Sequence, residues 1–592
     1  MKMRTDHAWM EGRHIGNGIR TIALIVDEIA ADYTREMIQD VMNSMPSDEK
    51  LRVVVFAGKS DDSASPLEDI RVHKEIYDNI YRIAGVAGFD GYIVSLGARD
   101  PFEDKDTYGE LLTKLSGVPS VFIGADFDVG LTVKYDNMPG IRDAVNLLIN
   151  VNGLTNLAML GGRDDNADAL DRKVIFRECL IDNGLDYGES FCVNTDMSED
   201  CAAEAEKLLD MNPDVQAIFC VNDAVAKGLY GVMKKRGLIP GRDIKVFGFD
   251  NTHMSGEIEP PLASIGSADI TVGGKALELL TSKLDGAEVS SAVVPTRLYG
   301  RKSLDYEQYV YTSQEIVKAD EAFIYRMFDD CFYRYASAKR DREGVNLRRL
   351  FYELVSRMLQ AMKRRYMSRE EFEELSRLVD IFMENGSLEL TDTHRFMDRL
   401  DLLQAGVNTS FRQSYVNVMI NRLFLRIKDN LIYVLAGQKE RNVTSELEGR
   451  HRMMRFNVMA TAVMDGDKAK NMDRVIRCIE SVGLKDAAFF MFDEAVVCEK
   501  GRQCVFPERI NLKCVVKDGE FYNTMPERQS CRMKDMFARE ELSSRCGGYL
   551  AFPVFCKTSL YGVLACGIGG DTHERGELIA NQLGQALYMC GC

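Results

Sequence analysis

Residues 215–265 read VQAIFCVNDAVAKGLYGVMKKRGLIPGRDIKVFGFDNTHMSGEIEPPLASI and contain two apolar runs of strand length. The runs, Ala217–Cys220 and Ile244–Phe249, are separated by an amphipathic helix pattern over Ala224–Lys235. Open α/β sheets bind ligands outside the carboxyl ends of their strands, so polar residues that follow the two runs should share one crevice. These residues are Asn222, Asp223, Asp250 and Asn251.

The same residues resemble the effector-binding domain of the LacI/GalR regulators, which share a fold with periplasmic sugar-binding proteins. The matching elements are the strand that ends in ND, the run RGLIPGRDIKVFGFD at 236–250, and PPLASI at 260–265. The resemblance implies a two-lobed clamp that closes on a small molecule, usually a sugar or a purine.

The resemblance also implies binding residues outside this run. Arg172 matches an arginine that clamps ligand hydroxyls in relatives, and Asp250 matches a carboxylate that accepts from them. Arginine and carboxylate groups together satisfy the donors and acceptors of a polyol, and an aromatic ring covers its apolar face. The predicted ligand-binding residues are Asp27, Tyr33, Asp136, Arg172, Asn222, Asp223 and Asp250. No catalytic residue, metal ligand or cofactor is predicted.

Structural roles remain open for several of these residues. Asn222 and Asp223 also suit the cap of the helix that follows them. Asp136 and Asn137 lie in the motif YDNMPG, which resembles the VDN-xx-G motif of the family, and could hold a turn between the lobes. Arg172 could also belong to the solvated face of its helix.

The composition is that of a soluble globular protein. The 592 residues should form roughly three to four domains. A net charge of -17 opposes non-specific nucleic-acid binding over the whole surface. No run approaches the ~18–20 apolar residues of a membrane span, and the N-terminus has no apolar signal-peptide core, so we expect a cytoplasmic protein. We expect most of the fifteen cysteines to be reduced, with no disulfide framework.

Residues 18–305 alternate strand and helix patterns, which predicts parallel sheets wound by right-handed crossovers. The predicted fold is a two-lobed α/β domain of the periplasmic-binding-protein type I class, with chain crossings near residues 124, 262 and 290. Residues 1–17 are expected to be a disordered N-terminus. The first strand, Thr21–Val26, begins too early for the helix-turn-helix headpiece of a LacI-type repressor. We therefore do not expect direct DNA binding through that element.

Residues 306–450 carry helix-period patterns almost throughout and are predicted to be an all-α region, with separate helices at Phe411–Ala436 and, further on, Val443–Met464. Nine basic residues lie close together here. They suggest either a substitute DNA-binding face or, as we favour, the solvated side of amphipathic helices near the acidic run at 370–374. The basic residues are Lys339, Arg340, Arg342, Arg348, Arg349, Arg357, Lys363, Arg364 and Arg365.

Residues 451–592 resemble a GAF domain, a small α+β sensory module. The matching elements are a strand before FDE, the hairpin AFPVF…YGVLACG, and a closing helix. A LacI-type sensor, helical spacer and GAF-like domain together resemble the input half of some bacterial diguanylate cyclases. Gly569-Gly570-Asp571 is not followed by the Glu-Phe of a GGDEF motif, and no other catalytic constellation was found.

The sequence therefore predicts a non-enzymatic, ligand-responsive signalling protein that binds a sugar-like or nucleoside-like effector. A homodimer and a protein signalling partner are expected, and no membrane partner. Two alternatives remain open. One is a LacI-family transcriptional regulator that reaches DNA through a non-standard element or a partner, and the other is a catalytically empty relative of a diguanylate cyclase.

Overall fold

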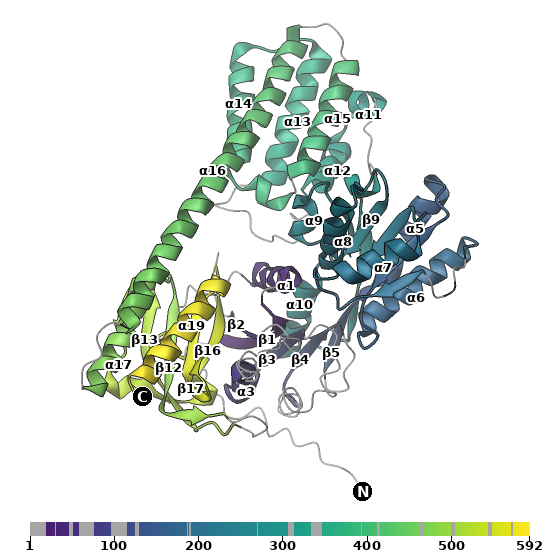
Figure 1. The fold of residues 1–592 in the computed structure, drawn as a ribbon. Coiled ribbons are helices and arrows are strands. Elements are labelled where there is room, and N and C mark those ends of the chain that lie inside the picture. The colour runs from purple at the N-terminus through teal and green to yellow at the C-terminus, as the bar shows by residue number, and fades with distance from the viewer. Residues whose placement is uncertain are drawn as a thin grey trace. The chain divides into compact units, whose positions relative to one another are not determined.

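A computed structural model describes residues 19–591 of the chain, with internal gaps (Figure 1). The predicted disordered segment 1–17 and the basic residues Lys339, Arg340 and Arg342 lie outside the described residues. The gaps are residues 30, 47–50, 59–75, 96–114, 116, 125–129, 186–187, 189–190, 269, 306–312, 333–345, 392, 411–414, 462–466, 499–503, 543–546 and 570–571.

The chain divides into two compact units. Unit 1 consists of 1–133, 276–291 and 446–592, and unit 2 of 134–275 and 292–445. The first three changes of unit fall close to the predicted crossings at 124, 262 and 290. Each unit combines one predicted lobe with one predicted C-terminal module, so compact units and predicted domains are different divisions of this chain. The domain limits at 305 and 450 remain predictions.

A parallel sheet forms the first lobe, in unit 1. Its order is β2–β1–β3–β4–β5. Every residue of β2 is buried, as expected for a strand covered on both faces. The strands are β1 (Arg20–Glu28), β2 (Leu51–Gly58), β3 (Gly91–Ser95), β4 (Ser120–Ile123) and β5 (Leu131–Asp136). The helices include α1 (Asp32–Asn43), α3 (Asn79–Val86) and α10 (Val272–Leu284).

The C-terminal part of unit 1 is an antiparallel sheet with helices. The predicted hairpin is confirmed, with a turn at residues 557–558 between its two strands. The strands are β12 (Ala487–Val497), β13 (Arg509–Lys517), β14 (Glu520–Asn523), β15 (Ser530–Arg532), β16 (Gly548–Cys556) and β17 (Ser559–Gly567). The helices are α17 (Lys468–Arg477), α18 (Pro526–Gln529) and α19 (Thr572–Met589).

The first lobe and the C-terminal part share one sheet and one core. Strand β2 pairs in parallel with β16, and the Val53 amide donates to the Gly547 carbonyl at 3.0 Å. The ring of Phe537 lies 5.8 Å from that of Phe56 and 5.7 Å from that of Phe89. Nothing in the sequence indicated this pairing, because register between distant strands has no local signal.

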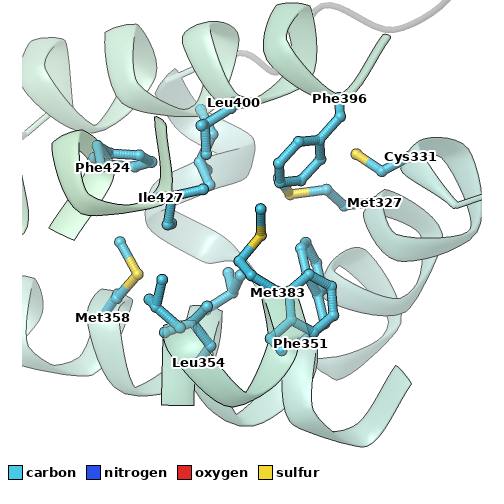
Figure 2. Close-up of a pocket in the computed structure, with 14 residues that line it drawn as sticks. Met327, Cys331, Phe351, Leu354, Met358, Met383, Phe396, Leu400, Phe424 and Ile427 are labelled. Carbon is cyan, nitrogen blue, oxygen red and sulfur yellow. The ribbon is translucent and has the colours of Figure 1, made fainter. Parts of the chain in front are cut away.

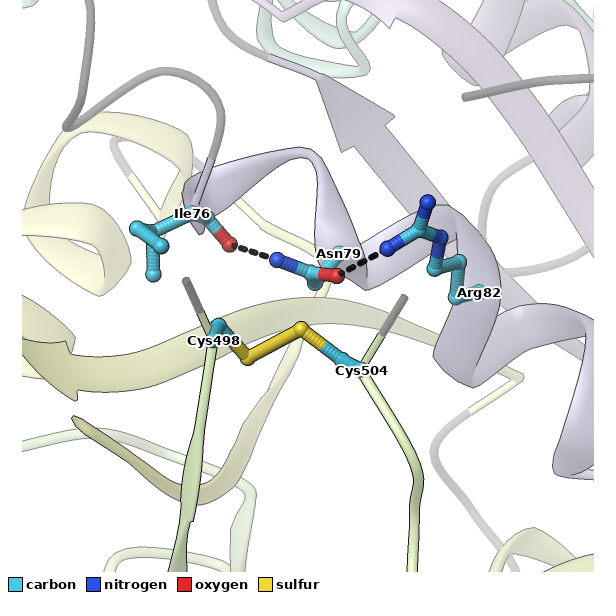
Figure 3. The surroundings of a disulfide bond; sticks show 5 residues. All are labelled: Ile76, Asn79, Arg82, Cys498 and Cys504. Atoms are coloured by element: carbon cyan, nitrogen blue, oxygen red, sulfur yellow. Dashed lines mark hydrogen bonds between the residues drawn. A yellow bond between two sulfur atoms is a disulfide. The ribbon is translucent and has the colours of Figure 1, made fainter. Parts of the chain in front are cut away.

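One cysteine pair in unit 1 departs from the sequence expectation. Cys498 and Cys504 form a disulfide beneath α3 (Figure 3). On that helix, Asn79 donates to the Ile76 carbonyl at 3.1 Å and accepts from Arg82 at 3.2 Å. The remaining cysteines among the described residues are not in disulfides. The sequence expectation of no disulfide framework did not include this pair.

A second sheet forms the core of unit 2. Its order is β7–β6–β8–β9–β10–β11, parallel except for the last pair. The strands are β6 (Leu157–Gly161), β7 (Cys192–Asn194), β8 (Ala217–Cys220), β9 (Lys245–Phe249), β10 (Ala263–Ser267) and β11 (Ala292–Tyr299). The helices include α5 (Asn137–Asn146), α6 (Ala167–Asp182), α7 (Ala202–Met211), α8 (Asp223–Lys235) and α9 (His253–Glu257).

The described residues after the second lobe are mainly helical, as the sequence predicted. The helices are α11 (Ser313–Lys318), α12 (Glu321–Cys331), α13 (Leu347–Arg364), α14 (Arg369–Glu384), α15 (Thr393–Ser410) and α16 (Tyr415–Thr461). The two helices predicted at Phe411–Ala436 and Val443–Met464 are one helix, α16, so the separate assignment was wrong. Gly437 lies between the two predicted helices, but one glycine costs a helix only about 1 kcal/mol. The predicted limit at residue 450 falls inside this helix.

None of the described helices combines the length and apolar content that crossing a bilayer would need.

Candidate ligand-binding site

Arg172 is the centre of a buried polar cluster in unit 2. It lies on α6 and is only 4% exposed. One guanidinium nitrogen, Nη1, donates to the Val221 carbonyl at 2.8 Å, just beyond the end of β8. The guanidinium carbon lies 3.6 Å from the ring centroid of Phe249, the last residue of β9. The arginine is thus held against the carboxyl ends of two neighbouring strands, and its alternative role on a solvated helix face is excluded.

Two carboxylates face the other end of this guanidinium. Nη2 of Arg172 lies 3.7 Å from Oδ1 of Asp250 and 3.8 Å from Oδ2 of Asp168. Both distances exceed hydrogen-bond length, so the charges are close without being joined. Burial raises the pKa of Asp250 to about 6, against the opposing effect of Arg172. Burial likewise raises the pKa of Asp168.

Asn137 extends the cluster from the first turn of α5. Its amide nitrogen donates to Asp171 at 2.7 Å, and a hydrogen bond from Asn137 to Asp168 lowers the pKa of that carboxyl. Two buried atoms of the cluster have no hydrogen-bond partner among the described residues, the Oδ1 acceptor of Asn137 and the Nε donor of Arg172. An unpaired buried donor and acceptor together are what a hydroxyl-bearing ligand can satisfy.

Asp250 and Asn251 adopt backbone conformations that are rare for residues with a side chain. Their φ angles are 99° and 51°. Hydrogen bonds hold the turn, since the Asp250 amide donates to the Ile265 carbonyl at 2.7 Å and Arg301 donates to the Asn251 side chain at 2.7 Å. Strain of this kind persists only where the surroundings enforce it, and it is often found at binding sites.

Asp223 has a connecting role. One carboxylate oxygen accepts from the amide and the hydroxyl of Thr252, at 2.8 and 3.0 Å, and the other accepts from the Ser264 hydroxyl at 2.6 Å. Burial, followed by the nearby charge of Asp250, raises its pKa to about 8. The side chain is 1% exposed. Asp223 thus ties the start of α8 to the turn after β9 and to β10.

Two other predicted residues serve as helix caps. Asn222 accepts from the Val225 amide at 2.9 Å and donates to the Met197 carbonyl at 2.9 Å, so both ends of its amide are engaged. Asp136 accepts from the Met138 amide at 3.3 Å and caps α5.

Asp27 and Tyr33 belong to unit 1. Asp27 lies near the end of β1, where its carbonyl accepts from the Tyr81 hydroxyl at 3.0 Å, and Tyr33 lies in the first turn of α1. Their side chains are partly exposed. Their ligand contacts remain predictions from the resemblance.

Three members of the cluster were absent from the predicted set, namely Asn137, Asp168 and Phe249. Asp168 precedes Arg172 by four residues on one helix, a spacing that places side chains side by side and could have identified it. For Phe249, the only feature of the sequence that could have placed it in the cluster is its position at the end of a strand.

The helical module contains a different kind of interior. Figure 2 shows a cavity of about 20 Å³ among apolar and sulfur-bearing side chains, room for about one water molecule. Its lining includes Met327, Phe351, Met358, Met383 and Phe396. The lining residues include no side chain that would bind a polar ligand.

Three of the six described residues of the basic stretch are paired with carboxylates. Arg357 lies 2.5 Å from Glu374 and Arg364 lies 2.6 Å from Glu371, which confirms the expected pairing with the acidic run at 370–374. Arg348 pairs with Asp329 at 2.7 Å. Within the described parts of the chain, no group of three or more His, Cys, Asp or Glu side chains could hold a metal ion.

The first half of the chain contains a periplasmic-binding-protein-like domain that is similar to those of LacI-type regulators. Residues 149–304 match the family model of the periplasmic binding protein-like domain.

Curated relatives with similar sequences are transcriptional regulators. The chain is 29% identical over 195 residues to the HTH-type transcriptional regulator CelR of Thermobifida fusca, covering 32% of this chain and 57% of that protein. It is 24% identical over 285 residues to the HTH-type transcriptional repressor CytR of Escherichia coli (strain K12), covering 47% and 77%. To catabolite control protein A of Priestia megaterium it is 33% identical over 177 residues, covering 29% and 52%. The matches thus span about half of CelR and catabolite control protein A and about three quarters of CytR.

Solved structures with a similar fold include a complex of the transcriptional regulator CelR with cellobiose, at 25% identity and a TM-score of 0.40 over 48% of this chain and 86% of that one. The Lac repressor bound to ONPG gives 20% identity and a TM-score of 0.39 over 49% and 83%.

Proposed function

We propose that this protein is a ligand-responsive signalling protein whose LacI-type domain binds a small, hydroxyl-rich effector and passes the binding event to its C-terminal modules. The effector class is sugar-like or nucleoside-like. Similar proteins include the transcriptional regulator CelR, which has been solved in complex with cellobiose, and this favours the class. The same relatives are transcriptional regulators, which favours a cytoplasmic location.

One observation carries the proposal: Arg172 is buried with an unpartnered Nε, opposite carboxylates that lie too far away for hydrogen bonds. Burying a charged group without full pairing costs free energy, which contacts with a ligand would offset. A polyol would supply oxygen acceptors to Arg172 and hydroxyl donors to Asp250 and Asn137. The ring of Phe249 already covers the other face of the guanidinium, which restricts the approach of the ligand.

A route for relay begins at the same turn. The backbone after Asp250 leads directly to Thr252, which precedes α9 and is held by Asp223. Helix α9 contacts α15 of the helical module. A ligand that changes the position of this turn would therefore also affect the packing of α15. It can shift that equilibrium only by its difference in affinity between two states, and a tenfold difference supplies about 1.4 kcal/mol.

The C-terminal part would act as a GAF-like sensory or output module, with another protein as its signalling partner. Its antiparallel sheet and closing helix agree with the resemblance in the sequence, which is the support for this assignment.

Thermal-shift measurements with monosaccharides, nucleosides and sugar phosphates test the proposal. A true effector should raise the Tm of the wild-type protein, and Arg172→Met or Asp250→Ala should abolish the shift. Arg242→Met is the matched control, because Arg242 is 64% exposed and pairs with its neighbour Asp243. An unchanged shift in Arg172→Met would refute the assigned site.

Transcription regulation is a second candidate, supported by the relatives' names alone. Sequence-specific DNA binding by the full chain that persists at elevated salt would favour it, whereas loss at modest salt would indicate non-specific binding.

A further inference from the structure

Helix α16 exposes an unusual number of large apolar side chains. It is 47 residues long and is the long green helix of Figure 1. Seven of its apolar residues are between 49% and 66% exposed, and large exposed apolar surfaces on soluble proteins mark contact sites. The seven residues are Val418, Leu425, Ile432, Val443, Leu447, Met454 and Val458.

These residues lie on one side of the helix, where the exposed residues Arg422, Asp429 and His451 are interspersed among them. With Ala436, which is also exposed, the seven apolar residues follow one another at spacings of seven or four residues from 418 to 458. At 3.6 residues per turn, such spacings return to the same side of a helix, so the apolar residues extend for about 60 Å along one face. We call these eight residues the α16 stripe.

The opposite face of α16 is already occupied. Over its first half, that face is buried in the core of the helical module. Packing within the module therefore accounts for one apolar face of the helix and not for the α16 stripe. The buried residues are Val416, Met419, Ile420, Leu423, Phe424, Ile427 and Leu431.

We propose that the α16 stripe is a homodimer interface, in which two copies of this chain pair their α16 helices in parallel. The exposed parts of the seven large side chains amount to roughly 700 Å² per chain, close to the ~800 Å² per partner of a standard stable interface. This surface lies outside the predicted LacI-type domain, residues 18–305.

The pattern favours a second copy in parallel register. In that register each apolar residue of the α16 stripe lies opposite the same residue of the second copy, as in a two-stranded coiled coil. An antiparallel pairing of the same length would place Leu425 opposite His451. It would also place Leu447 opposite Asp429 and so bury a charged group against an apolar one. Asp429 is exposed within the stripe, and in the parallel pair it would face its own copy.

Substitution of one residue of the α16 stripe, Leu425, by charged residues tests the proposal in the full-length protein. Leu425→Glu and Leu425→Lys should each weaken dimerisation at least 100-fold in analytical ultracentrifugation, because like charges would meet at the seam. Mixing the two variants should restore a dimer, since Glu and Lys would then face each other. Asp429→Leu should strengthen the dimer by removing a repelling pair.

Met459→Glu is the matched control. Met459 is 47% exposed on the same helix but lies off the stripe, so this variant should dimerise like the wild type. Far-ultraviolet circular dichroism checks that each variant is folded. A monomeric wild-type protein, a dimer that survives both Leu425 changes, or a mixture that stays monomeric would overturn the proposal. A Met459→Glu protein that is also monomeric would do the same.

Discussion

The LacI-type lobe and the helical module of unit 2 bury charge in opposite ways. In the helical module, Arg399 and Asp330 are 5% and 7% exposed and form an ion pair of 2.7 Å. In the lobe, Arg172 is buried to a similar degree, yet its nearest carboxylates lie 3.7 and 3.8 Å away.

The contrast separates an interior in which buried charges meet from one in which they stay apart. In the module, Arg399 and Asp330 meet each other, and the cavity of Figure 2 is apolar with room for about one water molecule. In the lobe, the guanidinium of Arg172 faces two carboxylates that both lie beyond hydrogen-bond distance. Burial alone therefore does not identify a functional site, and the spacing of the buried charges distinguishes Arg172 from Arg399.

The largest expected effect concerns the interior of the helical module. Phe351→Ala should lower stability by about 4 kcal/mol, because Phe351 packs against Phe328, Phe332 and Phe382 and its removal leaves a cavity. Chemical denaturation followed by circular dichroism measures this loss. The effector affinity of the folded fraction should not change. A parallel loss of affinity would mean that the two regions are more tightly coupled than their packing indicates.

A smaller effect is expected from pH on effector binding at the Arg172 cluster. The pKa of Asp250 is raised to about 6, so its carboxylate is charged above pH 6 and gains a proton as the pH falls through that value. If the charged form binds the effector, affinity at pH 5 should be about tenfold lower than at pH 7. Titration calorimetry at several pH values measures this, and Asp250→Asn should remove the dependence.

Stability without ligand should show the opposite trend. A carboxyl whose pKa is raised by folding binds protons more tightly in the folded state than in the unfolded state. Its stabilising contribution to the free energy of unfolding is therefore present at low pH and is lost as the pH rises through its folded pKa. For Asp250 that loss falls near pH 6, and for Asp223 near pH 8. Affinity and stability that fall together toward low pH would contradict this assignment.

The smallest effect distinguishes a cap from a ligand contact. Asn222→Ala should cost about 1 kcal/mol, because the Val225 amide loses its acceptor. Asn222→Ser keeps a cap and should recover most of that stability. Both variants should bind effector normally, since the two ends of the Asn222 side chain already have protein partners. A loss of affinity in Asn222→Ser, measured by titration calorimetry, would restore Asn222 to the ligand site.

Local patterns in the sequence were sufficient for much of the fold. The strand at Ala217–Cys220 was predicted to the residue, and the hairpin of β16 and β17 to its turn, because apolar runs and turn residues are local signals. Arg172 and Asp250 were paired through a family resemblance, and the structure brings them within 3.7 Å of each other, although ligand contact is untested.

What the sequence could not provide depends on tertiary packing. Asp136 and Asn137 are adjacent and chemically similar, and only the start of α5 determines that Asp136 caps the helix while Asn137 faces Asp168. Gly437 costs a continuous helix only about 1 kcal/mol, which packing can offset, so the glycine alone does not determine the length of α16. The disulfide of Cys498 with Cys504 has no motif that sets it apart from the other cysteines.

The pairing of β2 with β16 has a practical consequence for dissecting the molecule. A fragment that ends after the LacI-type domain, near residue 305, would lack β16 and leave one edge of β2 without a partner strand. Apart from Arg52, the side chains of β2 are apolar. An exposed apolar edge strand can pair with the same strand of another molecule, and such pairing leads to aggregation. Poor yield of such a fragment would therefore reflect a missing neighbour and not an inability of the sensor to fold.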